Sequence, residues 1–270
     1  MNHLMRWAGT LAIAAALGGC ATASNPRDPF EGFNRAMFTF NDKLDQVALK
    51  PAATAYQKVL PSFVQTGIGN FFGNIGDAWT AVNNLLQGKV GDGVTDIMRV
   101  AVNSTIGLFG LIDIGSEAGM TKHKQDFGAT LGVWGAGSGP YVVLPFFGPS
   151  TVRDTAALPV DWEGDLWHHV YPVDIRNSGM ALRVVEQRAA ALDASSLVES
   201  AALDRYEFIR DGYLQRRESK IKGDDSKPPK QNDGSSMNTP QPQPDAAADL
   251  NNAAVKPGEE PEAGSSSDVR

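Results

Sequence analysis

Serine and histidine side chains could support hydrolysis if their sequence neighbours place them in a catalytic motif. A serine nucleophile of the α/β-hydrolase type lies in a Gly-x-Ser-x-Gly turn, because glycine on both sides permits the strained backbone. Ser138 has alanine and proline two residues away, and Ser150 has Gly148 on one side but valine on the other. Neither serine fits the motif, so the sequence does not predict a serine hydrolase site.

The histidines and the glycine-rich segments do not supply another catalytic pattern. His123, His168 and His169 could act as bases with nearby aspartates, but their spacing does not match the His-x-x-x-His zinc pattern. The glycines at 135, 137 and 139 precede Pro140 instead of opening a helix, so they do not form a dinucleotide fingerprint. We therefore expect structural or surface histidines, no catalytic residue, no metal, no cofactor and no enzyme activity.

Cys20 is the residue with a predicted chemical fate. Residues 1–6 are basic, residues 7–17 are apolar, and Leu17-Gly18-Gly19-Cys20 follows, which is the order of an export signal. The apolar run is shorter than the ~20 residues that a membrane-spanning helix needs. Cys20 is the only cysteine, so a disulfide within the chain is excluded. An ordinary small residue near a cleavage site is the alternative.

The segment around Cys20 resembles a bacterial lipobox. The resemblance implies a signal peptide at 1–19, a diacylglycerol on the Cys20 thiol and a lipid-anchored linker at 20–27. Two or three acyl chains anchor a protein stably, whereas one chain is marginal. Similarity to sorted lipoproteins implies that Ala21, which is not aspartate, directs the protein to the outer membrane, facing the periplasm.

Residues 63–86 have a helical pattern with two unusual faces. One face is apolar, with Ile68, Phe71, Phe72, Ile75, Trp79, Val82, Leu85 and Leu86. The other carries small or amide residues, with Asp77 as its only charge: Gly69, Asn70, Gly73, Asn74, Gly76, Thr80, Asn83 and Asn84. A helix face in water usually carries Lys and Glu, so we expect both faces to avoid bulk water. A buried core helix and close packing in a bilayer both remain possible.

The other patterns predict a mainly α fold. Residues 28–44 resemble a helix capped by Asp28, residues 92–105 form another helical pattern, and residues 126–134 form a short one. The charged segment 180–222 predicts one or two surface helices. The only plausible strand lies near residues 141–144, where a short hairpin is possible. Arg153 and Asp154 are expected to form a polar hinge or an ion pair.

The C-terminal residues 223–270 have the composition of a disordered tail. They include seven prolines, no aromatic residue, and nine acidic against four basic residues. Most of the formal net charge of −7 therefore lies in this tail, and the body at 28–222 is nearly neutral. A nucleic-acid partner is not expected. A spacer, an acidic lure for a basic partner and solvated ballast are the alternatives for the tail.

Several ordered blocks together carry a family resemblance. They are DPFEGFNRAMFTFND at 28–42, NNLLQGK at 83–89, NSTIGLFGLIDI at 103–114, DFGATLGVWGAGSGPYVVLPFFGPSTVRD at 126–154 and DRYEFIRDGYLQRR at 204–217. Together they resemble the MlaA/VacJ lipoprotein family, although Ala129 and Phe109 depart from the family's frequent Gln and Gly. The resemblance implies a single ring-like, multi-helix domain seated in the inner leaflet of the outer membrane, often beside a trimeric porin. It also implies a channel that hands misplaced phospholipid to a soluble periplasmic carrier.

The implied role suggests residues for the lipid path. We expect Phe71, Phe72, Ile75 and Trp79 to seat the domain among acyl chains, and Asn70, Asn74 and Thr80 to face the lumen or neighbouring helices. In the uncharged segment 141–147, Pro140 and Pro145 restrict the backbone. Its gate residues would be Tyr141, Val143, Leu144, Phe146 and Phe147, although a buried strand and turn is the alternative. Lys122, His123 and Lys124 could meet lipid phosphate, but a solvated charge run is the simpler expectation.

Three functions of different classes remain open from the sequence. Lipid translocation predicts co-purified phospholipid and loss of outer-membrane asymmetry without the protein. A phospholipase or acyltransferase predicts lysophospholipid production that depends on Ser138 or Ser150. A structural lipoprotein that tethers a porin predicts binding without lipid transfer. We favour translocation, because it explains both the two-faced helix and the uncharged segment.

Overall fold

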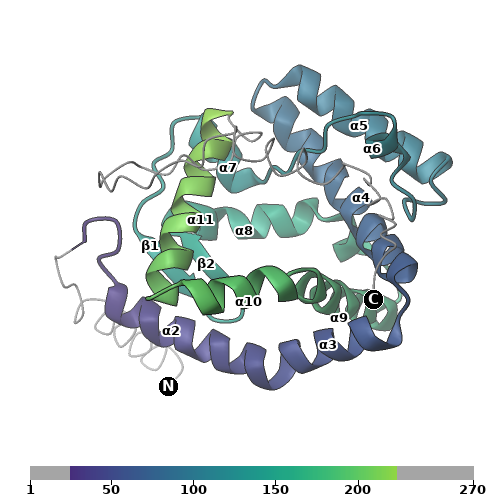
Figure 1. Cartoon of the computed structure of the whole chain (residues 1–270). Coiled ribbons are helices and arrows are strands. Elements are labelled where there is room, and N and C mark those ends of the chain that lie inside the picture. Colours follow the sequence, from purple (N-terminus) through teal and green to yellow (C-terminus); the bar gives the residue numbers. More distant parts are fainter. Residues whose placement is uncertain (1–24, 224–270) are drawn as a thin grey trace, which may run out of the picture. The chain divides into compact units, whose positions relative to one another are not determined.

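Hydrophobic residues at helical spacing form the helices of the N-terminal part, and prolines and glycines end these helices. The computed structural model describes residues 25–223 (Figure 1). Its helices and strands, in chain order, are α2 (Glu31–Leu44), the π-helix η1 (Asp45–Leu49), α3 (Lys50–Val59), α4 (Ser62–Leu86), α5 (Val90–Thr105), α6 (Ile114–Glu117), α7 (Phe127–Val133), β1 (Tyr141–Leu144), β2 (Gly148–Thr151), α8 (Val152–Gly164), the 3₁₀ helix η2 (Leu166–His169), α9 (Val173–Ala190), α10 (Leu192–Ala201) and α11 (Arg205–Lys222).

Two local breaks divide the first half of the chain. The continuous rod α2–η1–α3 ends at Leu60, whose extended backbone is the conformation preferred before Pro61. Gly88 has φ of 76°, a left-handed angle that costs glycine little, and it separates α4 from α5. The two helices then run back along each other, so α4 is held by α5 over much of its length (Figure 1).

The predicted strand pairs with a second strand in an antiparallel hairpin. Tyr141 of β1 pairs with Thr151 of β2, and Leu144 pairs with Gly148. Tyr141 and Val143 are buried against Tyr206 of α11, with Met37, Phe38, Tyr213 and Leu214 around them. The mainly α class with one short hairpin is therefore confirmed.

The apolar core is small and the buried polar network is large. A second apolar cluster joins Ala53, Tyr56 and Ala189, which connects α3 to α9. Many other buried side chains are polar, and hydrogen bonds must replace the water that they lose. Asn34, for example, donates to the Asp28 carboxylate at 2.8 Å and accepts from the Val143 backbone N–H at 2.8 Å.

Two local predictions are wrong. Asp28 does not cap α2, because its buried carboxylate instead accepts hydrogen bonds from Asn34, Tyr206 and Arg210. Residues 180–222 belong to three helices, and α11 is not a surface helix, since Tyr206, Arg210 and Arg217 are buried. Gly223, placed at the start of the tail, caps the end of α11.

Some predictions lie outside the described residues. These are the signal peptide, the Cys20 anchor and the tail beyond Gly223. The domain boundaries also stay predictions. Within residues 25–223, no helix is both long and apolar enough to cross a membrane.

Candidate functional site: a charged cavity bordered by apolar surface

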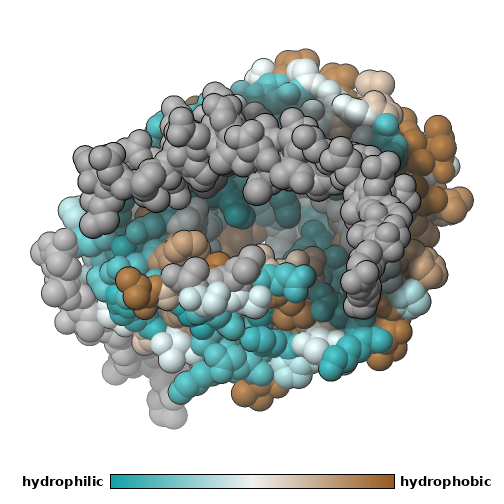
Figure 2. Space-filling view, viewed as in Figure 1, coloured by the Kyte–Doolittle hydropathy of each residue, from teal (hydrophilic) through white to brown (hydrophobic). Residues whose placement is uncertain are grey.

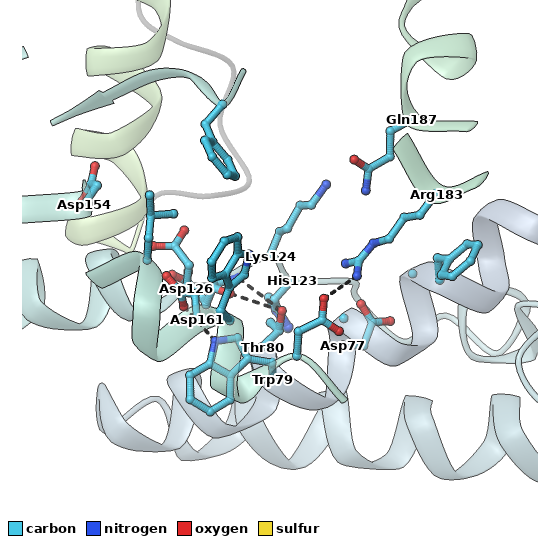
Figure 3. A pocket seen from close by; sticks show the side chains of 18 of the residues that line it. Asp77, Trp79, Thr80, His123, Lys124, Asp126, Asp154, Asp161, Arg183 and Gln187 are labelled. Atoms are coloured by element: carbon cyan, nitrogen blue, oxygen red, sulfur yellow. Dashed lines mark hydrogen bonds and ion pairs between the residues drawn. The ribbon is translucent and has the colours of Figure 1, made fainter. Parts of the chain in front are cut away.

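A cavity of about 1120 Å³ lies between the helices and the hairpin. Its wall is formed by α4, the segment between α6 and α7, the hairpin, α8, α9 and α11. Figure 3 shows Arg183 and Gln187 on one side and Asp126, Asp154 and Asp161 on the other, with Lys124 extending between them. The cavity therefore brings charges of both signs from distant parts of the sequence to one space.

The glycines of α4 make room for charged side chains of this wall. A Cβ atom at Gly69 would lie 2.7 Å from Glu186 Oε1, and one at Gly73 would lie 3.0 Å from Lys122 Nζ. Gly76 also faces the cavity, where an added Cβ would lie 3.9 Å from Arg183 Nη2. The space that charged side chains need thus explains the loss of helix propensity at Gly69 and Gly73, whereas Gly76 has room for a methyl group.

The cations on this side are paired with carboxylates. Lys122 Nζ lies 3.1 Å from Asp77 Oδ2, and Arg183 Nη1 lies 2.5 Å from Asp165 Oδ2. Burial raises the pKa of Asp77 and outweighs the opposing effect of Lys122. Burial likewise raises the pKa of Glu186. The carboxylates offset the positive charge without filling the cavity.

The opposite side contains a buried ion network centred on Arg217. Its guanidinium contacts Asp126 at 2.5 and 2.8 Å and Asp154 at 2.7 Å. Tyr213 donates to Asp154 at 2.8 Å, and Arg153 lies 2.9 Å from the same carboxylate. Burial raises the pKa of Asp126 and Asp154, but the bonds to Arg217 and its neighbours more than offset this, so both lie below their usual value. The predicted Arg153–Asp154 ion pair is confirmed.

Asp161 is a carboxylate of a different kind. Its Oδ1 accepts from Trp79 Nε1 at 2.8 Å and from the Phe127 backbone N–H at 2.7 Å. Both donors are neutral, and burial raises the pKa of Asp161. Asp161 therefore adds negative charge to the cavity wall while holding α4, α7 and α8 together.

The polar face of α4 is divided between the cavity and α5. Thr80 and Asp77 line the cavity. Asn74 and Asn84 instead bond to Ser104 and Asp96 of α5, at 2.9 and 2.7 Å. The expectation that this face avoids bulk water is confirmed for Asn74, Asp77, Thr80, Asn83 and Asn84, which are buried.

The predicted path residues fall into two groups. Thr80, Leu144 and Phe147 line the cavity. Tyr141 and Val143 lie in the core, Phe146 packs on Phe40 at 5.5 Å between ring centroids, and Asn70 donates to the Leu111 carbonyl. The structure thus brings only part of the set together, and the roles of these residues stay predictions.

None of the four predicted membrane-seating residues is strongly exposed. Phe72 is buried, Phe71 and Ile75 are half-buried, and Trp79 is half-buried beside Asp161. One group of exposed apolar side chains lies on α5 and on the following segment: Val94, Ile97, Met98, Ile106, Leu108, Phe109, Leu111 and Ile112. Other strongly exposed apolar side chains lie elsewhere in the domain, including Val47, Val59, Phe63, Tyr171 and Leu203. Figure 2 shows apolar residues along the edge of the view where α4, α5 and α6 lie.

The segment 122–124 borders the cavity, and Lys122 and Lys124 are exposed to solvent, as a solvated charge run would be. Lys122 and His123 also contact Asp77 and Asp96. Sequence reasoning missed Arg183, Glu186 and Arg217, because each lies on a charged helix whose local pattern resembles a surface helix. These charged side chains face inward because aspartates and glycines from distant parts of the sequence lie beside them in the fold.

The serines and histidines have structural contacts. Ser150 Oγ lies 2.9 Å from Thr155 Oγ1, His123 Nδ1 lies 3.0 Å from Asp96 Oδ1, and His169 Nε2 lies 2.9 Å from the Glu163 carbonyl. Within residues 25–223, no group of three or more His, Cys, Asp or Glu side chains is placed to hold a metal ion.

Comparisons with known proteins match most of this fold. A family model described as "MlaA lipoprotein" matches residues 26–220. The "Intermembrane phospholipid transport system lipoprotein MlaA" of Escherichia coli (strain K12) is 34% identical over 226 residues, which cover 78% of this chain and 87% of the relative. The protein of the same name from Haemophilus influenzae is 29% identical over 229 residues, covering 78% and 88%. A solved structure from work on the structural basis for maintenance of bacterial outer membrane lipid asymmetry aligns with a TM-score of 0.61 and 33% identity, covering 72% of this chain and 98% of that one.

Proposed function

Because the chain belongs to the MlaA lipoprotein family, we propose that it passes mislocalised phospholipid from the outer leaflet through its charged cavity to a periplasmic lipid carrier. Two relatives are named as lipoproteins of an intermembrane phospholipid transport system, and the solved structure concerns outer-membrane lipid asymmetry. The observation that carries the proposal is a cavity of about 1120 Å³ that holds charges of both signs in a domain with an extensive apolar surface.

The charges of the cavity suit the headgroup of a phospholipid. A phosphate can approach Lys122, Lys124 and Arg183, because these cations line the cavity and attract a negative charge. It must compete with Asp77 and Asp165, which already pair with Lys122 and Arg183. We therefore expect weak binding of the headgroup, which a transport path requires if the lipid is to leave again.

The exposed apolar residues suit the acyl chains around the domain. Val94, Ile97 and Met98 follow helical spacing on α5, and Leu108 and Phe109 extend the same apolar region beyond the helix. Contiguous exposed apolar surface of this kind marks a membrane or protein contact. We propose that this surface lies in the inner leaflet of the outer membrane, with Cys20 as the lipid anchor.

A trimeric porin and a soluble periplasmic phospholipid carrier complete the proposed system. The porin would lie beside the domain in the membrane. The carrier would receive the lipid on the periplasmic side. No chemical bond is made or broken in this process.

Reconstituted transfer tests the proposal. Acylated protein and porin are placed in asymmetric vesicles with labelled phospholipid, and transfer to the purified carrier is followed. Gly76→Leu puts a larger side chain into the cavity and should slow transfer about tenfold, which corresponds to about 1.4 kcal/mol in the barrier. Gly91→Leu is the matched control, because a side chain at this α5 position meets open space.

The outcomes separate the competing functions. Transfer that Gly76→Leu slows and Gly91→Leu leaves unchanged supports a path through the cavity. Equal rates for all three proteins would place the path elsewhere. Porin binding without any transfer by the unaltered protein would indicate a structural tether.

A further inference from the structure

A second, apolar groove lies outside the charged cavity. It has a volume of about 400 Å³ and lies between α4, η2 and α9. Its main apolar residues are Ile68, Phe71, Phe72, Trp167, Ile175 and Leu182. Asp174 and Ser178 are the polar residues at this groove, and both are exposed to solvent.

Three aromatic rings form one wall of the groove. The Phe71 and Phe72 centroids are 5.2 Å apart, and they lie 5.9 and 5.3 Å from that of Trp167. All three contacts are edge-to-face, which is a favourable arrangement of aromatic rings. The wall is therefore a packed unit, not a set of loose side chains.

Trp167 is fixed in place by its polar contacts and by a glycine. Its Nε1 donates to the Arg176 carbonyl at 3.0 Å, and its backbone N–H donates to Asp165 at 3.0 Å. Gly179 of α9 allows the indole to lie directly against the helix, because any Cβ at this position would overlap the ring. The contacts of Trp167 thus give the groove a rigid wall.

Phe72 connects this groove to the charged cavity. Its side chain lines both spaces, and the Arg183 guanidinium lies 6.0 Å from the Phe72 ring centroid. Arg183 is also a cation of the charged cavity. A site for apolar chains and a site for an anionic group therefore lie on either side of one aromatic residue.

We propose that the groove binds one acyl chain of a phospholipid on its way to the charged cavity. The inference rests on the proposed function and adds a binding site to it. An acyl chain fits better than a peptide, because a peptide brings N–H and C=O groups that an apolar groove leaves without partners. The phospholipid is favoured over other apolar ligands because the groove adjoins, through Phe72 and Arg183, the cavity that suits a charged headgroup.

Photocrosslinking tests the site directly. The full acylated protein, with porin, is reconstituted in vesicles of phosphatidylethanolamine with a diazirine in one acyl chain. After irradiation, mass spectrometry locates the adducts. We expect adducts at Trp167 and at residues 175–182 of α9, and we expect Ser178→Trp, which fills the groove, to lower their yield about tenfold.

Phe208→Trp is the matched control, since it places the same side chain at an exposed position of α11 outside the groove and should leave the groove adducts unchanged. Should Ser178→Trp lower the melting temperature, Leu182→Asn makes the groove polar with little change in volume and should also reduce the yield. Equal labelling of α5 and of the groove, unaffected by either groove variant, would mean bilayer contact only and would overturn the proposal.

The transfer assay distinguishes this inference from the proposed function. Transfer without groove adducts would contradict the acyl-chain site and leave the function in place. Groove adducts that Ser178→Trp abolishes, in a protein that transfers no lipid, would support the site and contradict the function.

Discussion

At the scale of single residues, the buried ion pairs are the costliest groups to disturb. Arg217 and Asp154 are almost fully buried and lie 2.7 Å apart. Removing one partner of such a pair leaves the other charge without compensation, which generally costs several kcal/mol. The network therefore fixes α11 against the α8 side of the cavity.

Asp154→Asn should lower the free energy of unfolding at pH 7 by about 3 kcal/mol. The folded-state pKa of Asp154 lies below the unfolded value of about 3.9, so its contribution is complete above that pH and is lost as the pH falls through the folded value. Urea unfolding at pH 7 and pH 3 measures both effects. The difference between the variant and the unaltered protein should shrink at pH 3.

Glu218→Gln is the control, because Glu218 pairs with Lys222 on the surface. Its effect should stay within about 1 kcal/mol. If Glu218→Gln lowered the free energy of unfolding more than Asp154→Asn, buried ion pairs would not be the costlier ones to disturb.

The two phenylalanines at the hairpin turn should differ in their effect on lipid transfer. Phe147 lines the cavity, whereas Phe146 packs on Phe40. Both are exposed, so aspartate at either position should be tolerated by the fold. In the reconstituted assay, Phe147→Asp should change the transfer rate and Phe146→Asp should change it less; the reverse order would show that the cavity does not identify the gate.

At the scale of elements, α4 combines poor helix propensity with two different packing requirements. Gly76 faces the cavity and has room for a methyl group. Gly93 of α5 packs against α4, where an added Cβ would lie 2.7 Å from Leu85 Cδ2 and 3.3 Å from the Ala81 carbonyl. Replacing glycine by alanine should therefore stabilise the fold at position 76 and destabilise it at position 93.

Gly76→Ala should raise the free energy of unfolding by about 0.5–1 kcal/mol, because alanine favours the helix. Gly93→Ala should lower it, because the methyl group separates α4 from α5. Thermal unfolding monitored by circular dichroism compares the two variants. Stabilisation by Gly93→Ala would show that the α4–α5 contact is looser than the structure indicates.

Local patterns predicted the elements where hydrophobic spacing is regular. The helix at 63–86, the helix begun by Asp126 and the strand at 141–144 were predicted within a few residues. Helix α8 was not predicted, because it contains Pro159. Strand β2 was not predicted, because Gly-Pro-Ser-Thr has little intrinsic preference for a strand. Strand β2 forms because β1 supplies its partner.

The candidate site was less predictable than the elements. The glycines of α4 and the uncharged hairpin were visible in the sequence. The inward direction of Arg183 and Arg217 was not, because their partners Asp165, Asp126 and Asp154 come from other elements. Charge burial depends on tertiary contacts, which a local pattern does not contain.

At the scale of the whole domain, the exposed apolar surface should support membrane binding beyond the lipid anchor. Phe109→Asp in a non-acylated protein with Cys20→Ala should weaken binding to phospholipid vesicles, because a charge replaces an exposed apolar side chain. Phe208→Asp on α11 is the matched control and should have little effect. Vesicle flotation measures the binding of both variants. An equal loss of vesicle binding in the two would contradict the assignment of the membrane-facing surface.

The central claim is that the lipid headgroup passes through the charged cavity. Its most direct test compares transfer of phosphatidylethanolamine with transfer of the same lipid carrying a long polyethylene glycol on its headgroup. A polymer larger than the cavity of about 1120 Å³ should abolish transfer by the protein, while a small headgroup should pass. Equal transfer of both lipids would contradict the account, because the headgroup would then travel outside the cavity.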